Sequence, residues 1–131
     1  MEIRVSRPVL DRLPAEAERA APDECCGILL GQDGHIEASR PAANVSADPH
    51  RHFEIDPQTL IDAHRAAREG GPQVLGYYHS HPGGAAEPSA TDCAQAAHDG
   101  RVWAIVGVGG VTFWRDEEAG FVPLSYIAVG R

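Results

Sequence analysis

The stretch 74–92, VLGYYHSHPGGAAEPSATD, is the part of this chain that says most about its fold and chemistry. Residues 74–81 favour a β-strand because they include a valine and two tyrosines, and the Pro-Gly-Gly sequence at 82–84 is expected to end that strand. His79 and His81 are two positions apart. On a strand, both rings therefore project from the same face, roughly 7 Å apart at the backbone, and both imidazoles can reach one ion.

Asp92 completes a predicted set of three metal ligands. The loop that follows residues 82–84 can bring Asp92, in the first turn of the next helix, back over the face that carries His79 and His81. Two imidazole nitrogens and one carboxylate oxygen at about 2.0–2.2 Å leave the fourth tetrahedral position open to water, which distinguishes catalytic zinc sites from closed structural ones. We therefore expect one Zn²⁺ per chain, held by His79, His81 and Asp92.

A hydrolytic zinc site also needs a general base. Zinc lowers the pKa of a bound water from about 16 towards about 7, so that a nearby carboxylate can take its proton and later pass it to the leaving amine. Glu24 is the candidate, Glu87 in the loop is a rival that spacing alone does not exclude, and Glu54 is a weaker one. The hydroxyl of Ser89 can donate to the developing oxyanion.

Structural roles compete with each of these assignments. Ser89-x-x-Asp92 has the spacing of a helix capping box, although capping and metal binding do not exclude one another. Glu24, judged by its neighbours alone, is more typical of a solvated strand end. The other histidines are typical of surface residues: His35, His50, His52, His64 and His98. The larger aromatic residues are assigned to packing: Tyr77, Tyr78, Trp103 and Trp114.

The remaining segments predict strands with helices between some of them. The apolar run CCGILLG at 25–31 indicates a buried strand, with His35–Pro41 as the returning arm of a hairpin. Apolar residues at helical spacing from Leu10 to about Ala21 predict a helix, which Pro14 is expected to kink. Further strands are expected at 2–6, 53–55, 102–108, 111–114 and 121–127, and helices at 57–69 and 91–99. This order is typical of a single mixed α/β domain, residues 1–131, with one central sheet.

Composition restricts the partners and the compartment. The chain has 131 residues, of which 43% are hydrophobic and 23% charged, and a formal charge of −8 without a Lys/Arg cluster, which argues against binding to nucleic acid. No apolar run approaches the roughly 20 residues needed to cross a bilayer, and the start MEIRVSRPVLDRL carries too many charges for a signal peptide. Cys25, Cys26 and Cys93 cannot form a disulfide framework. We therefore expect a cytoplasmic protein that does not bind membranes.

The candidate residues resemble a known signature. Glu24, followed by His79-x-His81-Pro82 and then by Ser89-x-x-Asp92, is similar to the motif of the JAB/JAMM metallopeptidases, the MPN-type zinc isopeptidases. The segment PDECCGILLG looks like the first conserved block of that family. The resemblance covers nearly the whole chain, and small bacterial members are the most similar. It implies a single α/β domain with a curved mixed sheet flanked by helices.

The resemblance also implies roles for individual residues. His79, His81 and Asp92 would be the zinc ligands, Glu24 rather than Glu87 the acid/base, and Ser89 the oxyanion donor. The family hydrolyses amide or isopeptide bonds after the C-terminal glycines of ubiquitin-like proteins, and some bacterial members act on sulfur-carrier proteins. Two alternatives are a zinc peptidase for small or cell-wall peptides and a catalytically silent interaction module. A homodimer is compatible with each of these functions.

Overall fold

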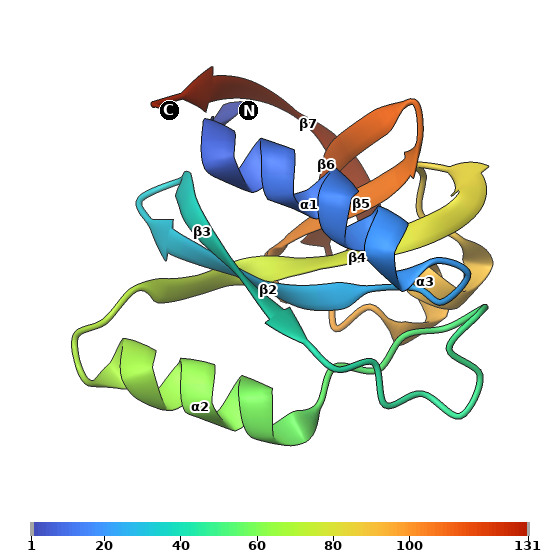
Figure 1. Cartoon of the computed structure of the whole chain (residues 1–131). Helices are drawn as coiled ribbons and strands as arrows, with labels where there is room; N and C mark the ends of the chain where they lie inside the picture. The colour runs from blue at the N-terminus through green and yellow to red at the C-terminus, as the bar shows by residue number, and fades with distance from the viewer. Residues whose placement is uncertain (1, 131) are drawn as a thin grey trace.

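The computed structural model describes residues 2–130, and within them seven strands and three helices follow one another along the chain (Figure 1). In chain order these are β1 (Glu2–Ser6), α1 (Arg7–Ala20), β2 (Cys26–Gln32), β3 (His35–Ala42), α2 (Pro57–Arg68), β4 (Gln73–Ala85), α3 (Ala90–Gln95), β5 (Val102–Val108), β6 (Gly110–Glu117) and β7 (Gly120–Val129). The predicted α/β order is confirmed, and α3 is shorter than the helix expected at 91–99.

The strands form one mixed sheet that closes into a barrel in the order β1-β3-β2-β4-β5-β6-β7. The first strand closes the barrel because it pairs in parallel with both β3 and β7. The central strand β4 lies between β2, with which it is antiparallel, and β5, with which it is parallel. A curved mixed sheet was expected, whereas its closure through β1 and β7 was not.

Helices α1 and α2 cover opposite faces of the sheet at β2 and β4 (Figure 1). Successive side chains of a strand point to opposite faces. On β2, Leu29 therefore packs into the core that contains Leu13 of α1, while Ile28 packs against Ala63 of α2. This alternation explains why the run at 25–31 is apolar almost throughout.

Helix α1 runs without a break through Pro14. Val9 and Leu13 are fully buried and hold the helix on the sheet. Pro14 lies on the exposed side. A proline inside a helix removes one backbone hydrogen bond to the carbonyl four residues earlier, and on the solvent side water can bind that carbonyl instead.

Strand β4 continues to Ala85, past the Pro-Gly-Gly sequence that was expected to end it. Its pairing with β5 is irregular between Ser80 and Ala85, and Ala85 then pairs with Val108. Gly83 adopts a positive φ of 70°, which is accessible to glycine without steric cost. Residues 82–84 therefore bulge the strand, and the chain turns towards α3 only after Ala85.

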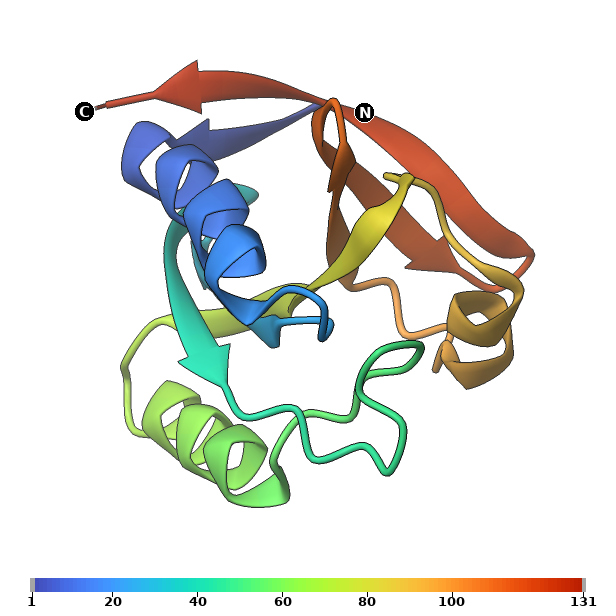
Figure 2. The same ribbon diagram turned by 45° about the vertical axis from the view of Figure 1, so that its right-hand side comes forward.

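The segment between β3 and α2, which we name the 43–56 loop, contains no regular strand, and the expected strand at 53–55 is wrong. Ile55 instead forms one isolated bridge with Asn44. The loop lies on the same side of the molecule as α3 (Figure 2), and its Phe53 contacts His79 in the middle of β4. Its backbone is held by side-chain bonds as well as backbone bonds, and the alternation of apolar residues does not reveal them.

Candidate metal site

The alternation of β4 places the two histidines as expected. His79 and His81 lie on the face of the sheet that also carries Tyr77, whereas Tyr78 and Ser80 point to the opposite face. Residue Cys26 of β2 is paired with His79. Cys25 directly precedes β2. Its backbone N–H donates to Ser80 Oγ (2.8 Å), and its carbonyl accepts from the backbone N–H of Ser80 (3.1 Å). This antiparallel pairing brings Glu24, the residue before Cys25, beside His81.

Three ligand atoms converge at this point. His79 Nε2 and His81 Nε2 are 3.0 Å apart, and each is 3.1 Å from Asp92 Oδ2. Ligands bonded to zinc at about 2.0 Å in tetrahedral geometry are about 3.3 Å apart, so the three atoms fit a metal ion with little adjustment. Two imidazole nitrogens and a carboxylate oxygen are also suitable donors for a divalent transition metal. His79, His81 and Asp92 therefore form a group able to hold a metal.

The second nitrogen of each ring is in a different environment. His81 Nδ1 is 2.9 Å from the carbonyl of Ala85, which can only accept, so Nδ1 carries the proton and Nε2 is free to bind a metal. His79 is fully buried, and its Nδ1 has no hydrogen-bond partner among the described residues. The His79 ring is instead stacked on Phe53, with centroids 4.3 Å apart and planes inclined by 16°.

Asp92 reaches the site through the capping box of α3. Ser89 Oγ accepts a hydrogen bond from the backbone N–H of Asp92 (3.0 Å), and the backbone N–H of Ser89 donates to Asp92 Oδ2 (2.9 Å). The same oxygen, Oδ2, faces both histidines. The capping box predicted from the sequence is therefore confirmed, and it orients the carboxylate towards the ring nitrogens. The Ser89 hydroxyl proton is not used by this cap.

The charges of the three side chains favour binding of a cation. Burial raises the pKa of Asp92, but the hydrogen bonds with His79, His81 and the Ser89 backbone outweigh it and hold the pKa below its usual range. Burial lowers the pKa of His79, so this ring is neutral, as a metal ligand must be. The hydrogen bond to Asp92 raises the pKa of His81. An anionic carboxylate thus faces two imidazole nitrogens in a mostly buried site.

Glu24 lies close enough to this group for its charge to interact with His81 and Asp92. Its side chain is only 7% exposed. Burial raises its pKa to about 7, an effect that the nearby His81 opposes and the Asp92 charge reinforces. A positive ion held by the histidines would lower this pKa again. Glu87 and Glu54, the two rivals considered from the sequence, are both exposed.

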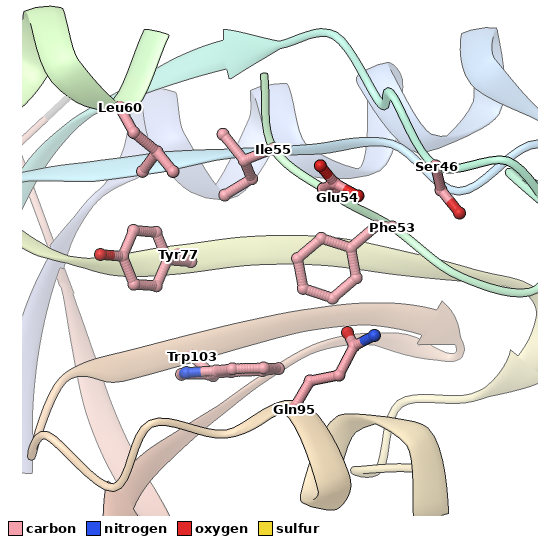
Figure 3. A pocket seen from close by; sticks show the side chains of 8 residues that line it. All are labelled: Ser46, Phe53, Glu54, Ile55, Leu60, Tyr77, Gln95 and Trp103. Carbon is pink, nitrogen blue, oxygen red and sulfur yellow. The ribbon is translucent and has the colours of Figure 1, made fainter. Parts of the chain in front are cut away.

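An aromatic cavity of about 380 Å³ adjoins the site. Phe53 and Trp103 separate it from His79, whose ring centroid is 5.5 Å from that of Trp103. Figure 3 shows Tyr77 and Trp103 on the strands, Leu60 and Ile55 opposite them, and Gln95 of α3 at the rim. A chain lying in this cavity would approach the metal ligands across the face of the sheet.

Part of the surroundings of the candidate metal site could not be predicted from the sequence. Tyr77 and Trp103 were assigned to packing, and Phe53 and Asn44 were given no role. Trp103 is 6% exposed and does pack, but it also forms the wall between the cavity and His79. The segment NVSADP at 44–49 carries Asn, Ser and Asp at the spacing of side-chain-bonded turns, which is the signal that identifies a structured loop here.

The neighbouring cysteines are not nucleophiles in this environment. Cys25 and Cys26 are both buried, and burial raises the pKa of the Cys25 thiol to about 11 and that of the Cys26 thiol to about 12. At neutral pH both are therefore protonated, and the thiolate is the reactive form. They act as small buried residues, Cys25 just before β2 and Cys26 at its first position.

The fold and the His-His-Asp group together define an α/β barrel with a group able to hold a metal on its central strand β4. The family described as prokaryotic homologs of the JAB domain matches residues 6–117. Because this match covers most of the chain, the protein belongs to that family, as the motif resemblance indicated.

The proteins to which this chain is similar in sequence carry several different names. The chain is 36% identical to a desampylase of Haloferax volcanii over 91 residues, which cover 68% of this chain and 66% of the relative. It is 35% identical to the tail tip assembly protein K of Escherichia phage N15 over 97 residues, 74% of this chain and 37% of the relative. It is 36% identical to a probable TtuB-protein conjugate cleaving protease of Thermus thermophilus over 92 residues, 70% of this chain and 62% of the relative.

The matched stretch thus spans less than two thirds of the length of each of these three relatives. Over its whole length the chain is similar to a protein of Desulfitobacterium hafniense solved in solution, with a TM-score of 0.86, 27% identity and coverage of 100% of this chain and 94% of the other. Among residues 2–130, no helix is long and apolar enough to cross a membrane.

Proposed function

We propose that this protein is a single-domain zinc-dependent hydrolase of amide or isopeptide bonds that follow the C-terminal Gly-Gly of a ubiquitin-like or sulfur-carrier protein. The observation that carries the proposal is the convergence of His79 Nε2, His81 Nε2 and Asp92 Oδ2 within 3.0–3.1 Å, next to a buried Glu24. Membership in the JAB-domain family and similarity to a probable TtuB-protein conjugate cleaving protease support the substrate class.

The residues divide the chemistry among them. Zinc, held by His79, His81 and Asp92, would supply a Lewis acid that acidifies the attacking water and polarises the scissile carbonyl. Glu24 would take the proton of that water and return it to the leaving amine, a role that suits a buried carboxyl beside the ligand group. Ser89 donates its hydroxyl proton to the oxyanion while its oxygen still accepts the Asp92 N–H.

The surroundings favour an extended peptide as substrate. The cavity is lined by aromatic and aliphatic side chains, and two of them, Phe53 and Trp103, also contact the His79 ring. An extended tail can lie there while the folded body of the carrier stays outside. Glycine, which lacks a Cβ, passes the crowded approach to the ligands more easily than any other residue. The net charge of −8 would suit a carrier with a basic docking face.

The tail specificity is testable with a carrier fusion. We expect a short extension fused after the Gly-Gly of a ubiquitin-fold carrier to be released between the second glycine and the extension, and Gly-Ala and Ala-Gly versions to be cleaved much more slowly. Mass spectrometry at matched enzyme concentration identifies the cleaved bond. Equal cleavage of the three fusions, or cleavage elsewhere in the extension, would remove the carrier-tail proposal and leave a general peptidase.

A second candidate keeps the same site and changes the substrate to a small or cell-wall peptide. One relative, a phage tail tip assembly protein, has a name that does not refer to a ubiquitin-like carrier. A silent interaction module is disfavoured because all five residues of the proposed site are present: Glu24, His79, His81, Ser89 and Asp92. Cleavage of short peptides at a rate equal to that of the carrier fusion would favour the second candidate.

The oxyanion role of Ser89 leads to a separate prediction. Ser89→Ala should lower kcat more than it raises KM, because an oxyanion donor acts mainly in the transition state, where one such bond contributes about 2.7–4 kcal/mol, or roughly 100- to 1000-fold in kcat. Loss of the cap alone costs about 0.5–2 kcal/mol of stability. Ser89→Thr retains the hydroxyl and serves as the control. If steady-state kinetics showed a change in KM only, Ser89 would be a cap and not an oxyanion donor.

A further inference from the structure

The amide of Asn44 makes four hydrogen bonds in and around the 43–56 loop, in addition to backbone bonds such as those from Val45 N–H to the Glu54 carbonyl (2.9 Å) and from Asp56 N–H to the Ala43 carbonyl (3.1 Å). Asn44 Nδ2 donates to the carbonyl of Glu24 (2.9 Å) and to the carbonyl of His52 (3.0 Å). Its Oδ1 accepts from the backbone N–H of Ser46 (3.1 Å) and of Glu54 (3.1 Å). A primary amide has two donor protons and two acceptor lone pairs, so every hydrogen-bonding capacity of Asn44 is used.

One end of this network fixes Phe53. The His52 carbonyl and the Glu54 N–H, both bonded to Asn44, belong to the residues on either side of Phe53. The Phe53 ring is stacked on His79. A metal-binding histidine is usually oriented by a hydrogen bond from its second nitrogen. His79 Nδ1 has no such partner among the described residues, so on that side the ring is oriented by packing, by the stack with Phe53 and the edge contact with Trp103.

The other end of the network fixes Glu24. Its carbonyl accepts from Asn44 Nδ2, and its backbone N–H donates to the carbonyl of Pro49 (2.8 Å). Both polar groups of the Glu24 backbone are therefore bonded to the 43–56 loop. The next residue, Cys25, is bonded to Ser80 of β4. The position of the Glu24 carboxyl relative to His81 thus depends on the loop as well as on the sheet.

We propose that Asn44 is a positioning residue, which uses a single side-chain amide to hold Glu24 and the Phe53-His79 stack in a fixed relation. This inference rests on the proposed function in one respect, the role of Glu24 as the base. Positioning matters because a displacement of about 1 Å at a catalytic group can cost about 100-fold in rate. Asn44 itself contacts neither the ligand atoms nor the cavity.

Two substitutions of Asn44 distinguish the effect of its hydrogen bonds from the effect of its side-chain volume. Asn44→Ala removes all four bonds, and Asn44→Asp keeps the shape but replaces the two donor protons by a carboxylate that faces the carbonyls of Glu24 and His52. Thr59→Ala is the matched control, because the Thr59 hydroxyl donates to Asp56 Oδ2 (3.0 Å) just beyond the loop. Asn44→Ser, which retains one donor, replaces Asn44→Ala if that variant does not fold.

The first readout needs neither activity nor metal. Protons of the His79 ring lie over the face of Phe53, so in NMR spectra they are shifted upfield by its ring current. We expect this shift and the Phe53-His79 proton contacts to be lost in Asn44→Ala and in Asn44→Asp, and to be retained in Thr59→Ala. Unchanged His79 ring resonances in a folded Asn44 variant would overturn the proposal, whatever reaction the protein catalyses.

The second readout is a double-substitution comparison on the zinc-loaded protein with the carrier fusion as substrate. Asn44→Ala should lower kcat about 10- to 100-fold with zinc content and KM close to those of the native protein. In a Glu24→Gln background the same substitution should change kcat by less than about 3-fold, because the group it positions no longer acts as a base. Equal losses in the two backgrounds would show that Asn44 does not act through Glu24. Absence of cleavage by the native protein would contradict the proposed function and leave the NMR result to decide the positioning role.

Discussion

His79→Ala should reduce the zinc content of the purified protein from about one equivalent per chain to near zero, and His81→Ala should do the same. Each substitution removes one of three protein ligands and leaves a single imidazole with the Asp92 carboxylate. Two ligands on an open site hold zinc far too weakly to survive dialysis against metal-free buffer. Hydrolysis should be lost with the metal, which makes this the largest effect expected of any single substitution. Metal analysis of the dialysed protein, alongside the cleavage assay, measures both.

The controls separate ligand loss from loss of packing. His79 is fully buried against Phe53, so its truncation also leaves a cavity that destabilises the fold. His79→Gln fills more of that volume, and it should also lose the metal while keeping a native circular dichroism spectrum. His64→Ala changes a histidine of α2 outside the ligand group and should keep a full equivalent. If both His79→Ala and His81→Ala kept their zinc, the assignment of the site would be wrong.

The part of the site that local sequence periodicity could predict is the part that lies within one segment. His79 and His81 share a face because β-strand side chains alternate, and Asp92 is oriented by a capping box that spans only three residues. Neither feature needs knowledge of the tertiary structure. The sequence predicted that the strand ends at residues 82–84, but β4 continues past them. Glycine and proline at a bulge allow a strand to continue past the irregularity.

Glu24 could not be chosen over Glu87 from spacing, and only the resemblance to the JAB/JAMM family favoured it. The physical reason lies in a long-range pairing: β2 is antiparallel to β4 in a register that places Cys26 beside His79 and Glu24 beside His81. Registers between strands about 50 residues apart in the chain are not encoded in any short pattern. Closure of the barrel through β1 and β7 was missed for the same reason.

The contributions of the 43–56 loop were missed because side-chain hydrogen bonds define it. Asn44 bonds to four different residues, and no apolar periodicity accompanies that arrangement. Phe53 was expected on a short strand, where it would have been one more packing residue. In the structure it lies in the loop and stacks on His79. Loops positioned by a rigid scaffold commonly carry function, and their local bonding chemistry is the feature to read in such sequences.

Glu24→Gln should retain zinc and the fold but lower kcat by about 10²–10⁴-fold, because an amide can neither accept the proton of the attacking water nor return it to the leaving amine. Glu87 is exposed, and the kcat of Glu87→Gln should be close to that of the native protein.

Steady-state kinetics over a pH range adds a second test. Activity of the native protein should fall as the pH drops through the pKa of Glu24, which a bound cation moves below its metal-free value of about 7. The acidic limb due to this carboxyl should be absent in Glu24→Gln. A larger loss in Glu87→Gln would show that the base has been misassigned.

The same substitution should stabilise the metal-free protein at neutral and alkaline pH. Burial raises the pKa of Glu24 from an ordinary value of 4.5 to about 7, so the folded state binds a proton more tightly than the unfolded state does. Below pH 4.5 the carboxyl is protonated in both states and contributes no difference. Between pH 4.5 and 7 the unfolded state releases the proton first, and the native protein loses stability relative to the Gln variant. Above pH 7 the difference is constant.

We therefore expect the Tm of metal-free Glu24→Gln to exceed that of the native protein at pH 8 and the two to converge near pH 4.5. A Tm difference that does not vary with pH would show that Glu24 is not held in a desolvated position, and its role as a poised base would lose its physical support.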